Sequence, residues 1–134
     1  MGDAALGLMN SSFWSPDLKN PVNEKFVTDF KTTYNRLPSL FAAQGYDAAL
    51  LMDSGIRQVG GDLKDKDKLR AALRKADFKS VRGPFKFNNN QFPIQSFYIR
   101  QVVKNDEGTL TNKIVSTAFE SHADAYCEQC PMKW

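Results

Sequence analysis

The chain has few side chains that could do covalent chemistry, and their spacing argues against each active site they could form. His122 is the only histidine; it lies in the polar segment ESHADAY, and no G-x-S-x-G sequence or Ser-His-Asp arrangement accompanies it. Gly60 and Gly61 fit neither the GxGxxG nor the GxxxxGKS/T pattern that cradles phosphates. The sequence therefore predicts a protein that is not an enzyme and has no catalytic residue.

Cys127 and Cys130 form a CxxC pair close to the C-terminus. Such a pair gains redox reactivity when the start of a helix lowers the pKa of its first thiol. Only four residues follow Cys130, beginning with Pro131, so we expect no helix there. With His122 the two thiols would supply at most three ligands to zinc, whereas a structural zinc site needs four. We expect no metal and no cofactor; a surface disulfide between Cys127 and Cys130 and two free thiols remain open alternatives.

The composition is that of one soluble domain of ordinary size. The 134 residues are 42% hydrophobic and 25% charged, which is enough apolar material for a core. The net charge is +3, but the basic residues are scattered, and residues 64–68 alternate in sign as a solvated surface does. Because nucleic-acid binding needs a basic face, we expect no nucleic-acid partner.

Neither a membrane span nor a signal peptide is predicted. No stretch approaches the roughly 18 to 20 apolar residues that cross a bilayer. The first ten residues, MGDAALGLMN, lack the basic start of a signal peptide. These features alone predict either a cytosolic chain or one whose export signal lies outside this sequence.

Three helices are predicted in the first 80 residues. Asn20 is a good N-cap with proline at the next position, and apolar residues then recur on one stripe of a helix over 21–35. Ser39 can cap a second helix over 40–59, which is apolar around most of its circumference and should therefore be buried on more than one side. A third, polar helix is predicted over 66–76.

Strands are predicted before and after the helices. Residues 5–12 form a short apolar run typical of a buried strand, and residues 88–90, three asparagines, predict a turn. Alternating segments near 94–103 and 115–119, separated by the turn signal at 105–108, predict a β-hairpin. The predicted class is α/β. A very apolar helix with so few strands indicates part of an α/β domain.

Four motifs in a fixed order resemble a known family. They are N-P-x-N-x-x-F at residues 20–26, A-x-x-Y-D-A-A at 43–49, R-G-P-F-K-F at 82–87 and F-P-I-Q at 92–95. The chain resembles the C-terminal portion of the periplasmic substrate-binding proteins of branched-chain amino-acid type (Leu/Ile/Val-like) ABC importers, which have the type I periplasmic binding fold. The F-P-I-Q segment is similar to members associated with aromatic acids as well as aliphatic amino acids.

The resemblance implies a protein of two Rossmann-like lobes, joined by three crossovers, that closes on a small ligand. This chain would be its last third. Residues 1–16 would be a hinge crossover strand, 17–80 the helical part of a partial Rossmann-like lobe, 81–120 its strands and hairpin, and 121–134 a C-terminal tail. A full member would reside in the periplasm and deliver an amino acid or small aromatic carboxylate to an ABC permease. Two alternatives remain open: a ligand-sensing regulatory domain of the same fold, and a truncated, non-binding remnant that self-associates through its exposed apolar helix.

The resemblance also implies which residues face the ligand. In this family most polar contacts to the amino-acid head group come from the preceding two thirds, so this chain would supply a side wall. The positions that map onto that wall are Phe13, Trp14, Phe41, Gln44 and Tyr46. For the four aromatic residues the alternative is packing in the hinge or the core. For Gln44 the alternative to a ligand is a backbone partner, because an unpaired amide is costly to bury.

Overall fold

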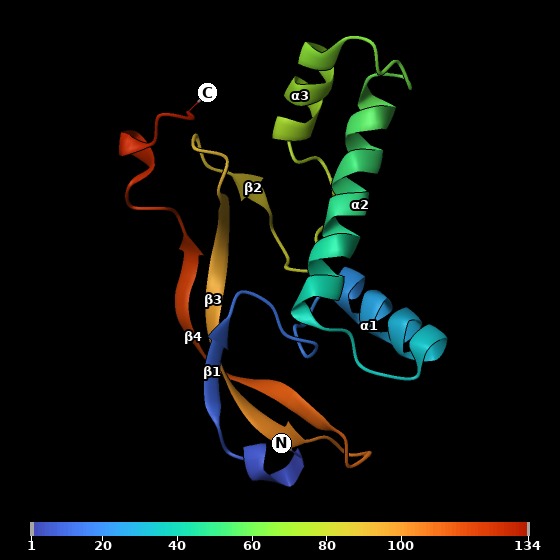
Figure 1. Cartoon of the computed structure of the whole chain (residues 1–134), viewed down its shortest axis with the longest axis vertical. Helices are drawn as coiled ribbons and strands as arrows, with labels where there is room; N and C mark the ends of the chain where they lie inside the picture. Colours follow the sequence, from blue (N-terminus) through green and yellow to red (C-terminus); the bar gives the residue numbers. More distant parts are fainter. Residues whose placement is uncertain (1, 134) are drawn as a thin grey trace.

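A long antiparallel hairpin forms one side of the molecule, and three α-helices form the other (Figure 1). The structure, a computed structural model, describes residues 2–133. Its α-helices are α1 (Pro21–Tyr34), α2 (Leu40–Gln58) and α3 (Lys66–Arg74). Its strands are β1 (Met9–Ser12), β2 (Lys86–Phe87), β3 (Pro93–Lys104) and β4 (Leu110–His122), and 3₁₀ helices span Gly2–Ala5 and Cys127–Gln129. The predicted α/β class, with three helices followed by a β-hairpin, is confirmed.

β3 is the centre of the sheet, and β1, β2 and β4 all pair with it in antiparallel orientation. β1 pairs from Met9 opposite Gln101 to Ser12 opposite Tyr98. β4 follows β3 along its length, but their register shifts at three places between residues 95 and 100. Such irregularities bend and twist a strand. Figure 1 shows the hairpin changing direction where β1 lies against it.

The strand predicted over residues 5–12 is shorter and less buried than expected. β1 begins only at Met9, which is 55% exposed, and a 3₁₀ helix precedes it. β1 pairs with β3 along one edge, and no other strand within residues 2–133 pairs with its second edge. The apolar run predicts a buried strand, but Leu6, Leu8 and Met9 lie at the surface.

α1 forms where its start and stop signals place it. Asn20 Oδ1 accepts a hydrogen bond from Asn23 N at 2.8 Å, and Pro21 occupies the first turn. The helix ends at Asn35, whose backbone is left-handed with φ of 50°. The helix predicted over 21–35 agrees with Pro21–Tyr34.

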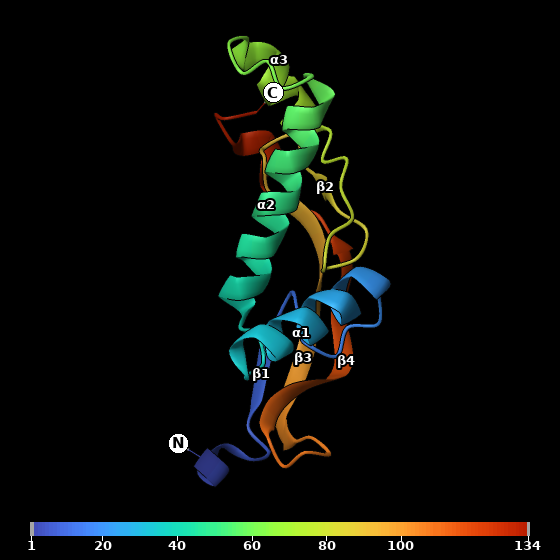
Figure 2. The ribbon, with the colours of Figure 1, turned by 90° about the vertical axis from the view of Figure 1, so that its right-hand side faces the viewer.

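α2 is capped by Ser39, whose Oγ accepts from Ala42 N at 3.3 Å, and it packs against α3. The close approach is at Gly55, where a Cβ atom would lie 2.5 Å from Leu73 Cδ2. α2 is covered only in part in the described chain, as expected for a very apolar helix with so few strands: Phe41 is 79% and Met52 45% exposed. Figure 2 shows α2 lying in front of the sheet with no element over its outer side.

The core lies between α1, α2 and the segments that flank them. Its fully covered members are Trp14, Phe26, Ala43 and Val81. The rings of Trp14 and Phe26 meet edge to face with centroids 6.2 Å apart. The core therefore joins the segment after β1 to both long helices, and it fixes that segment in place.

The three-asparagine turn holds the C-terminal tail. Asn89 Nδ2 donates to Glu128 Oε1 at 2.9 Å, and Asn90 Nδ2 donates to Asp124 Oδ2 at 2.6 Å. Hydrogen bonds from Lys133 and Asn89 hold the pKa of the Glu128 carboxyl below its usual range. His122, interpreted from sequence as part of a polar tail, instead ends β4 because it pairs with Gln95 of β3.

Candidate functional site

The N-P-x-N-x-x-F motif fixes the segment that enters α1. Asn23 is fully buried, and its Nδ2 donates to the carbonyl oxygens of Ser15, Pro16 and Leu18 at 3.4, 3.2 and 3.0 Å. Its Oδ1 accepts from Trp14 Nε1 at 2.8 Å. Because buried polar groups need partners, one asparagine satisfies both the indole and the turn. Trp14 is thereby held inside the core.

Asp47, on the buried face of α2, accepts hydrogen bonds from the loop after α3. Its Oδ1 accepts from Val81 N at 2.9 Å, and its Oδ2 accepts from Ser80 Oγ at 2.6 Å and from Arg82 Nε at 2.9 Å. Arg82 Nη1 in turn donates to Gln95 Oε1 at 2.8 Å. The side chains of Asp47 and Arg82 are only 3% and 12% exposed. This buried ion pair therefore ties α2 to the central strand of the sheet.

Phe13 lies beside this ion pair. The guanidinium carbon of Arg82 is 5.4 Å from the centre of the Phe13 ring and 4.5 Å from that of Phe85, close enough for cation–π attraction. Phe13 also meets Phe97 edge to face at 6.4 Å. The ring is half-buried and held by both neighbours, so it forms a fixed apolar surface next to a charged group.

Side-chain hydrogen bonds connect β1, β3 and β4 in a region that we call the strand junction. It comprises residues 9–17, 98–101 and 112–114. Arg100 Nε and Nη2 donate to Asn10 Oδ1 at 2.9 and 2.7 Å, and Arg100 Nη1 donates to the Trp14 carbonyl oxygen at 2.8 Å. Asn10 Nδ2 donates to Asn112 Oδ1 at 2.7 Å. Burial lowers the pKa of the Arg100 guanidinium, an effect that the charge of Asp17 opposes.

A groove of about 380 Å³ opens between the strand junction and the start of α2. We call it the junction groove. Its walls are Trp14, Pro16, Arg100 and the segments 37–40 and 110–112. Most of these residues are apolar, and Arg100 is the one charged residue among the described residues that line it. Its exposed lining is nevertheless about as polar as it is apolar, so it is more polar than most small-molecule pockets.

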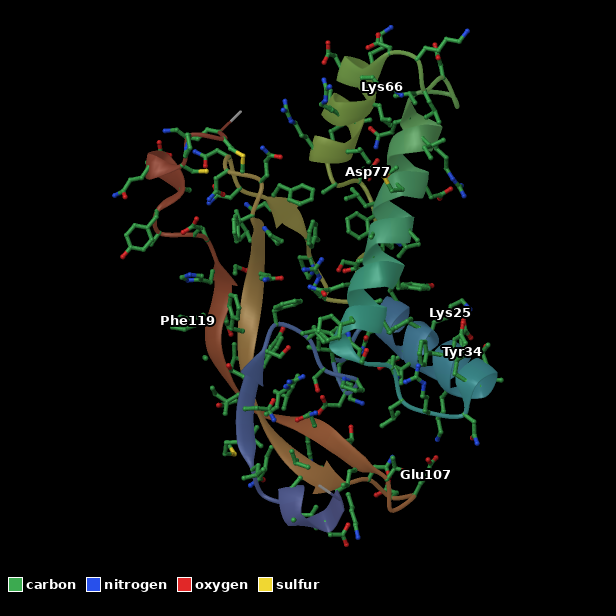
Figure 3. The ribbon with its side chains drawn as sticks, in the orientation of Figure 1. Lys25, Tyr34, Lys66, Asp77, Glu107 and Phe119 are labelled. Carbon is green, nitrogen blue, oxygen red and sulfur yellow. The ribbon has the colours of Figure 1, made fainter. Side chains whose placement is uncertain are left out.

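The turn of the hairpin lies beside α1. Figure 3 shows Glu107 in this turn, beneath the helix that carries Lys25 and Tyr34. Lys31 of α1 forms a salt bridge with Glu107. Both side chains are about half exposed, so the pair contributes little to stability. It nevertheless joins two parts of the chain that are 76 residues apart.

The five predicted wall residues divide into three groups by their burial. Phe41 and Gln44 are exposed at the start of α2, and Gln44 makes no side-chain hydrogen bond to any residue of the described chain, so neither the core alternative for Phe41 nor the backbone alternative for Gln44 is realised. Phe13 and Tyr46 are half-buried, and the Tyr46 ring lies 4.7 Å from that of Phe26. Trp14 is 1% exposed, which favours the packing alternative for this residue. The structure does not gather all five around one cavity, and their contact with a ligand stays a prediction.

A second groove, of about 330 Å³, runs between α1 and α2. Its floor is aromatic, with Phe26, Phe30, Tyr34 and Tyr46 among the lining residues. Tyr46 thus faces this groove rather than the junction groove. No arginine or lysine is among the described residues that line it, but the guanidinium carbon of Arg36 lies 5.7 Å from the centre of the Phe30 ring.

Sequence reasoning missed the charged residues of the site. Asp47 and Arg82 lie inside two of the four motifs, but the sequence did not predict that they form a buried ion pair. Arg100 was not predicted to belong to the site. The signal was available for Asp47, a carboxylate on an otherwise apolar helix face, which is rarely buried unless paired. For Arg100 the alternation of β3 gave no such signal, because both faces of the strand carry apolar residues.

The C-terminal cysteines are free thiols in the structure. Cys127 begins a 3₁₀ helix where no helix was expected, and Cys130 follows it. A disulfide between them stays a prediction. Across residues 2–133 no three side chains of His, Cys, Asp or Glu gather as a metal site would require. No helix in the same range is long and apolar enough to cross a membrane.

A family model matches most of the chain. Residues 1–108 match the family described as periplasmic binding protein. The "Leu/Ile/Val-binding protein homolog 6" of Brucella abortus is 32% identical over 127 residues, which cover 92% of this chain and 32% of the relative. The chain therefore spans about a third of the length of the curated relatives it matches.

Solved structures give the same likeness. A solute-binding protein of an ABC transporter from R. palustris, in complex with benzoate, is 37% identical with a TM-score of 0.81 over 92% of this chain and 33% of that one. A solute-binding protein from Rhodopseudomonas palustris BisB5, in complex with 3,4-dihydroxybenzoic acid, is 32% identical with a TM-score of 0.81 over 93% and 34%. The leucine-binding protein LivK of Thermotoga maritima is 29% identical with a TM-score of 0.68 over 87% and 33%.

Proposed function

Because the chain belongs to the type I periplasmic binding proteins of ABC transporters, the family its motifs resemble, we propose that it is part of a solute-binding component for amino acids or small aromatic carboxylates. The observation that carries this proposal is the likeness, at 37% identity over 92% of this chain, to a solute-binding protein whose structure holds benzoate. The chain spans 33% of that protein. The complete site, the ABC permease partner and the periplasmic location are therefore proposed for the whole protein.

The strand junction is the proposed hinge. Residues 1–16 serve as its crossover, in which Met9–Ser12 form the strand, and residues 17–80 as the helical part of one lobe. Residues 81–120 are its strands and hairpin, and residues 121–134 are the tail, whose first two residues end β4. The register shifts of β3 and β4 at residues 95–100 support this assignment, because an irregular ladder bends more readily than a regular one. Binding energy closes such a hinge, and no covalent step is involved.

Phe41 and Gln44 form the proposed wall at the start of α2, and Phe13 supports it near the hinge. Phe41 is the most exposed of the large hydrophobic residues described, at 79%. A phenyl ring left this open favours contact with another apolar surface. An apolar solute held between lobes would provide that surface without disturbing the core, because Phe41 packs little in this chain.

Binding by the 134-residue chain tests the proposal. Calorimetric titration with leucine, isoleucine, valine, benzoate and 4-hydroxybenzoate should give a Kd for one class of solute, with a matching rise of the melting midpoint because the ligand binds the folded state. Phe41→Ala should weaken that binding roughly tenfold, or about 1.4 kcal/mol. At concentrations where the chain is monomeric, the melting midpoint without ligand should hardly change, because Phe41 is mostly exposed.

Phe119→Ala is the matched control. Phe119 is 58% exposed on β4, and Figure 3 shows it pointing away from the helices. The Phe119→Ala variant should bind the solute with the same Kd as the wild type. Equal losses in both variants, or a cooperative melt that no solute shifts, would count against the proposal.

A further inference from the structure

Arg100 carries a positive charge that no carboxylate of the described chain neutralises by direct contact. Its three hydrogen bonds go to neutral oxygens, two to Asn10 Oδ1 and one to the Trp14 carbonyl. A guanidinium has five N–H groups, so one remains on each terminal nitrogen. Arg82 differs, because it forms a salt bridge with Asp47 at 2.9 Å.

Because Arg100 is partly buried, it is costly for its guanidinium to carry a charge that no directly bonded anion balances. The side chain is half-buried, and burial is the largest cause of the lowered pKa of its guanidinium. A partly buried cation is stabilised when an anion pairs with it. Asp17 acts on it only through its charge; one oxygen of Asp17 accepts from Ile114 N at 3.0 Å, and the other is buried without a partner. Two N–H groups of Arg100 therefore have no partner among the described residues, and Arg100 lines the junction groove.

The junction groove has room for the rest of such an anion, and apolar side chains form part of its wall. Arg100 lines the groove, and Leu37, Pro38 and Leu40 provide apolar wall beside it. The groove of about 380 Å³ is large enough for a single ring or a branched aliphatic group. Its wall includes Ser39 and Leu40, the N-cap and first residue of α2, a helix of 19 residues whose positive end favours the same charge.

We propose that the junction groove is a carboxylate subsite in which the free N–H groups of Arg100 bind the acid group of the solute and the leucine and proline side chains contact its apolar body. This inference rests on the proposed function and names the group that selects the solute. Benzoate, 3,4-dihydroxybenzoic acid and leucine, the ligands named for the similar proteins, share a carboxylate and an apolar body. Arginine matches a carboxylate with two parallel hydrogen bonds, which a neutral amide cannot accept in the same way.

The test compares benzoate with benzamide, a neutral molecule of nearly the same shape. Calorimetric titration of the wild-type chain should give a Kd for benzoate at least tenfold below that for benzamide. Arg100→Gln should bind benzoate at least tenfold more weakly and should no longer distinguish the two molecules. Arg57→Gln removes the same charge from the exposed C-terminal end of α2, and should leave both constants unchanged.

Arg100→Gln also loses bonds to Asn10 and Trp14, so its folding is checked by circular dichroism. If it does not fold, Arg100→Lys, which keeps the charge, is used instead. Its preference for benzoate over benzamide should be smaller than that of the wild type but not absent. Equal affinity for benzoate and benzamide in the wild type, or undiminished benzoate binding by Arg100→Gln, overturns the subsite and leaves the proposed function standing. A wild-type chain that binds none of benzoate, leucine and the other solutes contradicts both.

Discussion

At the scale of single residues, the buried pair of Asp47 and Arg82 should dominate the charge contribution to stability. Asp47→Asn removes the charge that faces a guanidinium only 12% exposed. Because this leaves an uncompensated buried cation, we expect a loss of about 3 kcal/mol in the free energy of unfolding. Urea denaturation followed by circular dichroism measures it. Asp29→Asn removes the carboxylate of the exposed pair with Lys25 and should cost under about 0.5 kcal/mol. Similar losses of unfolding free energy in the two variants would show that burial does not make the Asp47 pair contribute more to stability than an exposed pair.

Residue roles were predictable where the signal is local to the chain. Asn20 followed directly by Pro21 predicts the start of a helix from adjacent residues alone, and the cap forms as predicted. Asn23 and Trp14 could not be paired from sequence, because their hydrogen bond depends on how the turn folds back on α1. The same limit hid Arg100, whose partners lie 86 and 90 residues away in the chain.

At the scale of elements, two glycines of α2 should respond oppositely to substitution. A side chain at Gly55 would press on Leu73 of α3, so Gly55→Val should lower the free energy of unfolding by about 2 kcal/mol. Nothing lies within 4 Å of a Cβ at Gly45, so Gly45→Ala should raise it by about 0.5 to 1 kcal/mol through helix propensity. Chemical denaturation of both at one protein concentration measures the difference. Destabilisation by both substitutions would mean that contacts of α2 other than its contact with α3 determine how glycine substitutions change stability.

Helix bounds were more predictable than strand bounds for a physical reason. The helices predicted over 21–35, 40–59 and 66–76 differ from α1, α2 and α3 by at most two residues, because caps and a 3.6-residue period are properties of adjacent residues. β1 and β2 exist only through pairing with β3. A two-residue strand such as Lys86–Phe87 has no periodicity to detect, and the apolar run at 5–12 did not indicate where pairing begins.

At the scale of the whole molecule, the four motifs identified the family although the chain spans about a third of its relatives. The structure explains why they were sufficient. The first motif supplies the cap, the asparagine and the phenylalanine of the core, the second supplies Tyr46 and Asp47, and the third supplies Arg82. The fourth supplies Gln95, which accepts a hydrogen bond from Arg82. Each motif contributes to a contact between distant segments, so together they specify how the elements are joined. The exposed side of α2 lies outside these contacts.

That exposed side leads to a prediction about association. Phe41, Gly45, Ala48 and Met52 recur along one face of α2, and all four are exposed. Covering such an apolar face is favourable by about 25 cal/mol per Å², so the 134-residue chain alone should form dimers or larger oligomers at micromolar concentration. The double substitution Phe41→Ser with Met52→Ser should shift the chain toward the monomer in light scattering coupled to size exclusion.

Phe119→Ser provides the comparison, because it makes a residue that is 58% exposed polar on the opposite side of the molecule. It should leave association unchanged if the face of α2 is responsible. A wild-type monomer with a cooperative melt would argue against the oligomer and would mean that α2 tolerates solvent along its outer face. Association that Phe119→Ser abolishes and the α2 variant does not would move the interface to β4, whose outer edge is also unpaired among the described strands.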